Sequence, residues 1–303
     1  MTKPSKPGEP HPVVMNRFHT AVALLTLSAC GFAAHHHHVR HHRHAHRRTH
    51  HRHAAAPYKP HHFDDAGHPI RYSEFKLGHA RYHVVIANVA DPAVEASTVL
   101  YRGLSTVWNL VRTPHACAAV TGTFFAPRSG YPVGDVVVDG TLKVFGRRGS
   151  AMAIDYYGQP HVFDTEFGKS VDWSPYRWAL RGTVRLVRDG RPSPNPKAQK
   201  FHDRRIWSRV ARTGAGVTQS GKLVLIATTS PVTLTEFARA MIKLGVRDAV
   251  NLDGGSSTCL FYRGIVVIRP GRRLSNMLVL TEIESAKGSA RVRASATSIY
   301  LNQ

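Results

Sequence analysis

The stretch Asp248-Ala249-Val250-Asn251-Leu252-Asp253-Gly254-Gly255-Ser256-Ser257-Thr258-Cys259-Leu260 organises the rest of this chain. An apolar strand is predicted to end at the Asp253 carboxylate, where a side chain can leave the sheet and face a cleft. The glycine pair that follows permits positive φ and lets a ligand approach the backbone closely. Three hydroxyl side chains then lie beside freed backbone N–H groups, which suits an anionic or sugar ligand. The alternative is a β-hairpin loop in which these residue types serve only the turn.

Residues 1–34 are predicted to be a leader rather than part of the fold. The apolar segment 21–29 is too short to span a membrane and is typical of a signal peptide. It runs into Leu27-Ser28-Ala29-Cys30-Gly31, which resembles the bacterial lipoprotein signal with Cys30 as the acylated residue. Ordinary cleavage after Ala33 or Ala34 is the alternative. Both predict secretion across the inner membrane, to the periplasm or to a membrane anchor.

Residues 35–62 are rich in histidine and arginine and contain no acidic residue, so they cannot bury a core. We predict a disordered, polycationic spacer that separates the leader from a folded domain at 63–283, with a C-terminal tail at 284–303. Neutral imidazoles bind Zn²⁺, Ni²⁺ and Cu²⁺, so a metal-binding role of the spacer is the sharper alternative.

The chain of 303 residues is basic, with a formal net charge of +22. Nine of its 41 Lys and Arg residues and one of its 19 acidic residues lie in residues 1–62, so residues 63–303 keep a net charge of +14. A basic exported domain suits an anionic partner such as a sugar phosphate, an acidic polysaccharide or a membrane surface. We expect no nucleic-acid partner, because no nucleic-acid motif accompanies the charge. The sequence leaves open whether Cys117 and Cys259 form a disulfide.

The domain is predicted to contain many short strands and few helices. Strands are expected at residues 81–90, 118–125, 133–138, 141–145, 151–155, 160–163, 179–187, 223–228, 259–262, 265–268 and 277–281. Helices are expected at 104–111 and at 233–244, where Thr233 and Glu236 form a capping box. Tight turns such as Asp139-Gly140 join neighbouring strands. We therefore predict a single domain of the α+β class with a mainly antiparallel or mixed sheet.

Several sequence blocks occur in the order seen in the phosphodiester glycosidases, and the chain resembles that family. The blocks are residues 120–125, 132–140, 186–190, 212–217, 233–244, 251–258 and 273–280. The family contains relatives of the lysosomal uncovering enzyme and bacterial exopolysaccharide-associated proteins. The resemblance implies hydrolysis of the bond between a sugar anomeric carbon and a phosphodiester. The chain departs from the family at Thr121, where Asn is frequent, and at Gly254-Gly255, where three glycines are frequent.

Cleavage of such a bond needs a carboxylate at the anomeric centre, and a cation near the phosphate matters more than acid assistance. We assign Asp253 to the first role and Arg212 to the phosphate clamp, with a surface ion pair as the alternative for Arg212. Asp135 is the candidate second carboxylate, with an outward-facing strand residue as its alternative. The substrate-binding candidates, each with a structural alternative, are Thr121, Thr123, Gly254, Gly255, Ser256, Ser257 and Asn276.

The sequence thus predicts a hydrolase that acts on cell-envelope or exopolysaccharide glycans. One rival is a non-catalytic glycan-binding or export-accessory protein of the same fold, and the other is a periplasmic metal-binding lipoprotein. No metal-ligand spacing is specific enough to assign a cofactor. A carboxylate beside a Gly/Ser loop is nevertheless compatible with a divalent cation.

Overall fold

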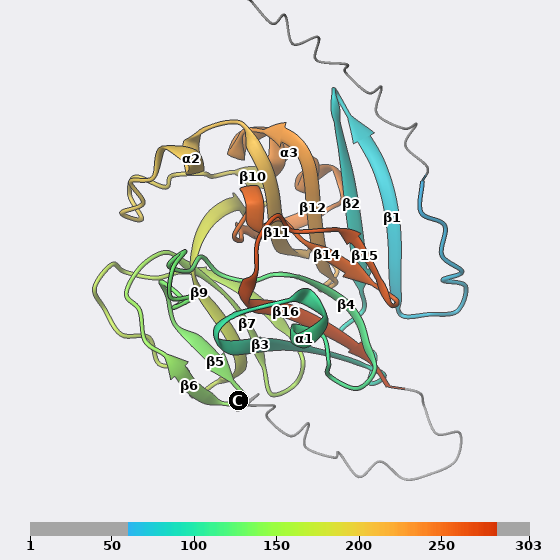
Figure 1. Cartoon of the computed structure of the whole chain (residues 1–303), viewed down its shortest axis with the longest axis horizontal. Helices are drawn as coiled ribbons and strands as arrows, with labels where there is room; N and C mark the ends of the chain where they lie inside the picture. Colours follow the sequence, from blue (N-terminus) through green and yellow to red (C-terminus); the bar gives the residue numbers. More distant parts are fainter. Residues whose placement is uncertain (1–59, 284–303) are drawn as a thin grey trace, which may run out of the picture. The chain divides into compact units, whose positions relative to one another are not determined.

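A computed structural model describes residues 60–283 of the chain (Figure 1). The predicted leader at 1–34, most of the spacer at 35–62 and the tail at 284–303 lie outside the described residues. Cys30 lies there too, so secretion and lipid anchoring stay predictions. In the described part of the chain, no helix has the length and apolar character needed to cross a bilayer.

The described residues form two sheets in which every paired strand is antiparallel to its neighbour. The larger sheet contains β1 (Ile70–Leu77), β2 (Ala80–Ala87), β5 (Val136–Val138), β6 (Thr141–Val144), β7 (Ser150–Asp155), β8 (Pro160–Asp164), β9 (Tyr176–Arg188), β10 (Arg191–Pro192), β11 (Val210–Thr218), β12 (Leu223–Val232) and β13 (Val246–Asn251). The smaller sheet contains β3 (Val94–Ser105), β4 (Ala116–Thr121), β14 (Leu260–Tyr262), β15 (Ile265–Ile268) and β16 (Leu274–Glu282). The main strand orders are β1-β2-β12-β11-β13-β9-β5-β6 and β15-β14-β4-β16-β3.

Within residues 60–283, three short helices accompany the sheets: α1 (Val107–Leu110), α2 (Arg204–Trp207) and α3 (Leu234–Lys243). The predicted α+β class with mainly antiparallel sheets is therefore confirmed. The capping box of α3 is also confirmed. The Glu236 N–H donates to the Thr233 hydroxyl at 3.2 Å, and the Thr233 N–H donates to the Glu236 carboxylate at 2.8 Å.

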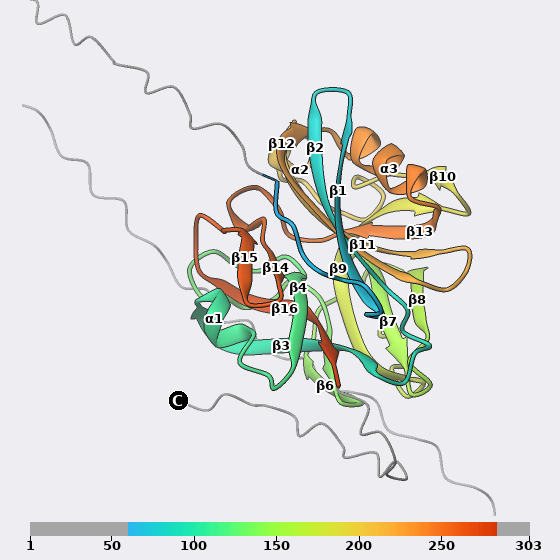
Figure 2. The ribbon, with the colours of Figure 1, turned by 90° about the vertical axis from the view of Figure 1, so that its right-hand side faces the viewer.

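Buried apolar faces arrange these elements in layers. One core lies between the sheets and joins Leu225 of β12 to Val120 of β4. Phe237 and Met241 of α3 pack on the other face of the larger sheet, and Leu110 of α1 packs on the other face of the smaller sheet (Figure 2). Because the central strands are buried on both faces, β2 ends and β12 begins with an uninterrupted apolar run, at residues 84–87 and 223–227.

The prediction of a helix at 104–111 was wrong for the first half of that range. Leu104 lies in β3, and only Val107–Leu110 is helical. Trp108, within this helix, is 51% exposed. The strands β1 and β3 were not predicted, because charged and polar residues interrupt their alternation of apolar side chains.

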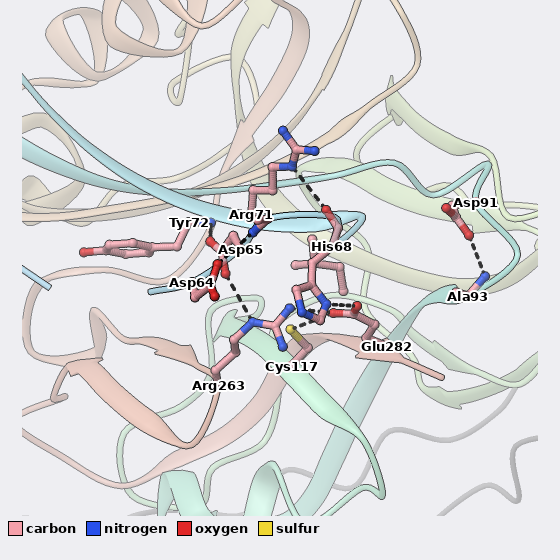
Figure 3. A network of polar contacts seen from close by, with 12 residues as sticks. Asp64, Asp65, His68, Arg71, Tyr72, Asp91, Ala93, Cys117, Arg263 and Glu282 are labelled. Atoms are coloured by element: carbon pink, nitrogen blue, oxygen red, sulfur yellow. Dashed lines mark hydrogen bonds and ion pairs between the residues drawn. The ribbon is translucent and has the colours of Figure 1, made fainter. Parts of the chain in front are cut away.

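A polar network ties the beginning of the described chain to the end of the smaller sheet (Figure 3). Asp65 accepts hydrogen bonds from the Tyr72 N–H at 2.7 Å and from Arg263 Nε at 3.2 Å. Arg263 also pairs with Glu282 at 2.8 Å, and the other carboxylate oxygen of Glu282 contacts His68. These contacts join the segment before β1 to the β14–β15 turn and to β16.

The two cysteines in the described chain are buried free thiols. Cys117 Sγ lies 3.6 Å from Glu282 Oε2 in the same network (Figure 3). Burial raises the pKa of Cys117 and of Cys259 to about 12. The disulfide that the sequence left open is not formed, and thiols with such pKa values are poor nucleophiles at neutral pH.

Candidate active site

The loop after β13 carries the chain from the larger sheet to the smaller one. The Leu252 N–H still donates to the Thr213 carbonyl of β11 at 2.9 Å. The Asp253 N–H instead donates to the Gly122 carbonyl at the end of β4, also at 2.9 Å. A 3-10 turn at Gly255–Ser257 then leads into β14. Asp253 therefore lies where the two sheets meet, at the end of the strand that the sequence predicted.

The two glycines after Asp253 are required for different physical reasons. A Cβ on Gly254 would lie 2.8 Å from the Ala211 carbonyl oxygen, so glycine lets the loop pack directly on β11. Gly255 has φ of +59°, in the left-handed region that favours glycine. The tight loop is thus built from close backbone approach and a left-handed turn.

The Asp253 carboxyl group is buried beside one cation. Its Oδ2 accepts a hydrogen bond from Arg272 Nη2 at 2.8 Å, and the Ser257 hydroxyl and the Gly254 N–H also hydrogen-bond to it. Arg272 Nε donates to the Ser257 hydroxyl, so the three side chains contact one another. Burial raises the pKa of Asp253, while Arg272 and the hydrogen bonds oppose the rise. A carboxyl group perturbed in this way is typical of a functional site.

Arg272 is the residue of this site that the sequence analysis missed. Its guanidinium lies 4.3 Å from the centroid of the Phe125 ring, in a cation–π arrangement, and its side chain is 28% exposed. Within residues 60–283, Nη1 of Arg272 has no hydrogen-bond partner, so one end of the guanidinium is available to a ligand. The sequence feature that could have identified Arg272 is the family block at 273–280, which begins one residue after it.

Arg212 lies on β11, but no contact joins its guanidinium to the Asp253 carboxylate. It is 2% exposed and donates to the carbonyls of Val232 at 3.2 Å, Ile206 at 2.9 Å and Ser208 at 2.6 Å. Burial lowers the pKa of Arg212 to about 10. Ile206 lies in α2, and Ser208 follows that helix directly. The hydrogen bonds from Arg212 to these two carbonyls therefore hold α2 against β11. Its role as a phosphate clamp stays a prediction.

The α2 segment brings further positive charge to the site. The pKa of Arg205 is raised first by its hydrogen bond to Asp203 and also by attraction to Asp253. The exposed Arg205 therefore lies within electrostatic reach of the candidate carboxylate. Phe201, just before α2, packs against Phe124 with ring centroids 5.5 Å apart. The segments around residues 124 and 201 thus place α2 beside the loop that holds Asp253.

Asp135 is buried in a different set of contacts. Its Oδ1 accepts from the Gly146 N–H at 2.6 Å, and its Oδ2 accepts from Trp173 Nε1 at 2.9 Å and from Arg181 Nη1 at 3.4 Å. Arg181 is itself fully buried. Both carboxylate oxygens are therefore engaged in holding neighbouring segments together. No contact joins Asp135 to Asp253, and its role as a second catalytic carboxylate stays a prediction.

Three of the predicted substrate-binding residues join strands at the sheet junction. The Thr121 hydroxyl donates to the Ser257 carbonyl, and the Thr123 hydroxyl donates to the Arg181 carbonyl at 2.6 Å. Asn276 Oδ1 accepts from the Thr123 N–H at 2.7 Å, and the Asn276 amide donates to the Thr123 carbonyl at 3.2 Å. All three side chains are buried, and their contacts hold β4, β9, β16 and the Asp253 loop in register.

The loop also contains polar groups that remain open to a ligand. Ser256 is exposed, and its carbonyl accepts from the Gly271 N–H at 2.8 Å, which places the adjacent Arg272. Two buried atoms near the loop, Asn251 Oδ1 and Thr258 Oγ1, have no hydrogen-bond partner in the described chain. Buried polar atoms are normally satisfied, so such atoms point to a bound water or ligand.

Metal ligands do not accompany Asp253 in the described structure. In residues 60–283, no group of three or more His, Cys, Asp or Glu side chains is arranged to hold a metal ion. The site of the described chain therefore consists of one buried carboxylate, one partly exposed guanidinium and a set of hydroxyl and amide groups.

A model of the phosphodiester glycosidase family matches residues 114–281, a range that contains Asp253, Arg272 and Arg212. The chain belongs to the phosphodiester glycosidase family. The resemblance recognised in the sequence blocks is thereby confirmed.

Two curated members of the phosphodiester glycosidase family are similar to part of the chain. Human N-acetylglucosamine-1-phosphodiester α-N-acetylglucosaminidase is 29% identical over 193 residues, which are 56% of this chain and 36% of the relative. The bovine protein of the same name is 27% identical over 190 residues, 55% of this chain and 35% of the relative. The chain thus spans about a third of the length of these relatives.

Two solved structures share the fold. The zebrafish N-acetylglucosamine-1-phosphodiester α-N-acetylglucosaminidase catalytic domain, auto-inhibited by its pro-peptide, superposes with a TM-score of 0.57 at 22% identity. The match covers 70% of this chain and 82% of that one. A hypothetical protein from Synechocystis superposes with a TM-score of 0.54 at 15% identity, over 70% of this chain and 61% of that one.

The burial of Asp253 predicts a specific dependence of stability on pH. Because its folded-state pKa is raised above the ordinary 3.8, the proton on Asp253 stabilises the fold at low pH, and this contribution is lost as pH rises through the raised pKa. Asp253→Asn resembles the protonated form. We expect its melting temperature to equal that of the wild type at about pH 3 and to match or exceed it at pH 7. A lower melting temperature of the variant at pH 7 would show that the carboxylate serves mainly as a structural acceptor.

Proposed function

We propose that this protein hydrolyses the bond between a sugar anomeric carbon and a phosphodiester in cell-envelope or exopolysaccharide glycans. The observation that carries the proposal is the buried Asp253 carboxyl group, with its raised pKa, held by Arg272 and Ser257 at the junction of the sheets. Family membership supports the reaction class. The human and bovine relatives are named as enzymes that act on an N-acetylglucosamine-1-phosphodiester, which supports an amino-sugar phosphodiester as one substrate to test.

In the proposed reaction, the bond between the anomeric carbon and the phosphate oxygen breaks, and a bond from that carbon to a water oxygen forms. Positive charge develops on the sugar ring as the leaving group departs. The Asp253 carboxylate stabilises that charge or accepts the proton of the attacking water. The proton that water releases passes to solvent, and the phosphate leaves as a phosphomonoester of the rest of the glycan.

The cation for the phosphate is Arg272 in this proposal. Its Nη1 is available to the ligand, and the Phe125 ring beneath the guanidinium fixes the plane in which it donates. Arg205 adds positive charge within reach of Asp253, and Arg212 contributes by holding α2 in place. Developing negative charge on a leaving phosphate is stabilised most by such fixed donors.

Activity measurements on the full chain test these roles. We expect Asp253→Asn to lower kcat by a factor on the order of 10² or more, as loss of positioned proton transfer or charge stabilisation typically does. Arg272→Gln is expected to lower kcat/KM by about tenfold or more, because a charged hydrogen bond to phosphate is lost. The matched control is Arg273→Gln, which removes an equal charge from the adjacent exposed residue and should leave activity nearly unchanged.

The assay follows release of free sugar from N-acetylglucosamine-1-phosphodiesters and related sugar-1-phosphodiesters, with and without chelator. Loss of activity in chelator would place a divalent cation at the site in addition to Arg272. Turnover of none of these substrates by the wild type would favour a glycan-binding accessory of the same fold. Equal activity of wild type and Asp253→Asn would remove Asp253 from the mechanism.

We also propose that the protein acts in the periplasm as a lipoprotein anchored through Cys30. The support is the sequence Leu27-Ser28-Ala29-Cys30-Gly31 at the end of a short apolar segment. In detergent-free fractionation, the wild type should pellet with membranes and Cys30→Ser should be released into the soluble fraction. Equal release of both forms would make the cysteine signal fortuitous and favour ordinary cleavage.

A further inference from the structure

A cavity lies toward the opposite end of β13 from the candidate active site. It has a volume of about 430 Å³ and is lined by residues of β8 and of the adjoining ends of β11 and β13. Asp248 lines it near the start of β13, whereas Asp253 follows the end of that strand. Five residues of extended chain span about 16 Å, so the cavity is separate from the Asp253 site. Its volume is in the range of pockets that bind small ligands.

One wall of the cavity is aromatic. The rings of Phe163 and Tyr176 stack with centroids 5.4 Å apart, and the His161 ring meets Tyr176 edge-on at 5.5 Å. These rings come from β8 and β9, on either side of β7. The intervening β7 presents the small side chains Ala151 and Ala153 beneath them, because apolar residues of β7 alternate between small and large. The small side chains of Ala151 and Ala153 thus leave space for the aromatic rings above β7.

A second wall of the cavity is polar and includes Asp248, Arg247 and Gln219. The guanidinium of Arg185 is almost fully buried and donates both to the Asp248 carboxylate and to the Val162 carbonyl, the latter at 3.2 Å. Arg185 therefore links β13 to β8, and its two partners Asp248 and Val162 both line the cavity. Arg247 is more than half exposed and lies 3.6 Å from Asp248, so it presents donors beside that carboxylate. The exposed Gln219 amide completes this wall.

The charge around the cavity is balanced, unlike that of the domain. Near the cavity, three arginines form ion pairs with three aspartates. Arg185 pairs with Asp164 and Asp248, Arg188 pairs with Asp164, and Arg247 pairs with Asp189. Residues 63–303 as a whole carry an excess of 14 positive charges. A site with no excess of positive charge does not select a polyanion and suits a neutral ligand.

Strand addition by a peptide does not fit this cavity. β8 pairs with β7 alone, so its other edge faces the cavity. The Val162 carbonyl already accepts from Arg185, and Pro160 at the start of β8 has no N–H to donate. The edge therefore lacks the row of open backbone groups that a docking strand requires.

We propose that this cavity binds neutral sugar residues of a glycan chain, as a second site distinct from that of Asp253. The apolar C–H face of a pyranose ring stacks on the surface formed by His161, Phe163 and Tyr176. Its hydroxyls hydrogen-bond to Asp248, Arg247 and Gln219, which offer both donors and acceptors. The proposal does not depend on the hydrolytic function, because it concerns binding and not turnover.

The test uses the full chain carrying Asp253→Asn and measures binding of N-acetylchitotetraose, cellotetraose and maltotetraose by calorimetry. At least one of these neutral oligosaccharides should bind. Phe163→Ala and Arg247→Ala, introduced singly, should each weaken that binding at least tenfold. Tyr157→Ala is the matched control, since it removes an 85% exposed aromatic ring near the same sheet edge that does not line the cavity.

Near-ultraviolet circular dichroism and melting temperature confirm that each variant is folded. Arg272→Gln should leave oligosaccharide binding unchanged, whereas its effect on hydrolysis, measured in the chain that keeps Asp253, reports separately on the Asp253 site. Binding of none of the three oligosaccharides would overturn the proposal. So would binding that survives both cavity substitutions, or that Arg272→Gln abolishes.

Discussion

The hydrogen bond from the Asp253 N–H to the Gly122 carbonyl is the contact on which the candidate active site depends. It joins the end of β13 in the larger sheet to the end of β4 in the smaller one. Without that crossing, the Ser257 hydroxyl and the Arg272 guanidinium, which both follow on the smaller-sheet side, would not meet the Asp253 carboxyl group. The buried contacts of Thr121, Thr123 and Asn276 support the same junction. The buried polar residues at the junction of the two sheets therefore stabilise the fold, and the fold in turn positions the residues of the candidate site.

The electrostatic character of the site follows from that placement. Burial between two sheets raises the pKa of Asp253, and the partly exposed Arg272, with the hydrogen bonds from Ser257 and Gly254, opposes the rise. Positive charge is concentrated around this carboxyl group, from Arg272 and from Arg205 on α2, and Arg212 holds α2 through backbone carbonyls. The cavity beside β8 has a different chemical character from the Asp253 site. Its arginines are paired with aspartates, and one of its walls is aromatic. One domain thus offers two chemically different surfaces.

Sequence reasoning succeeded where the signal is local. The capping box of α3 depends on residues three apart, and Asp253 was placed at a strand end by the apolar run before it and the glycines after it. It failed where contacts are distant. Arg272 reaches Asp253 only because β14 and β15 turn back, and the direction of the Arg212 side chain depends on α2. Likewise, Asp135 meets Arg181 across 46 residues, which no local pattern reveals. The helix expected at 104–111 was shortened because β3 takes Leu104 into sheet pairing.

The most direct test of the central claim is the pH dependence of kcat/KM for the wild type and for the residual activity of Arg272→Gln. If the ionised Asp253 carboxylate performs the reaction, activity falls as pH drops through its raised pKa. Arg272 lowers that pKa, so its removal should move the acid limb of the profile to higher pH. Arg273→Gln should leave the limb in place. An acid limb that Arg272→Gln does not move would contradict the assignment of Asp253 and Arg272 as one functional unit.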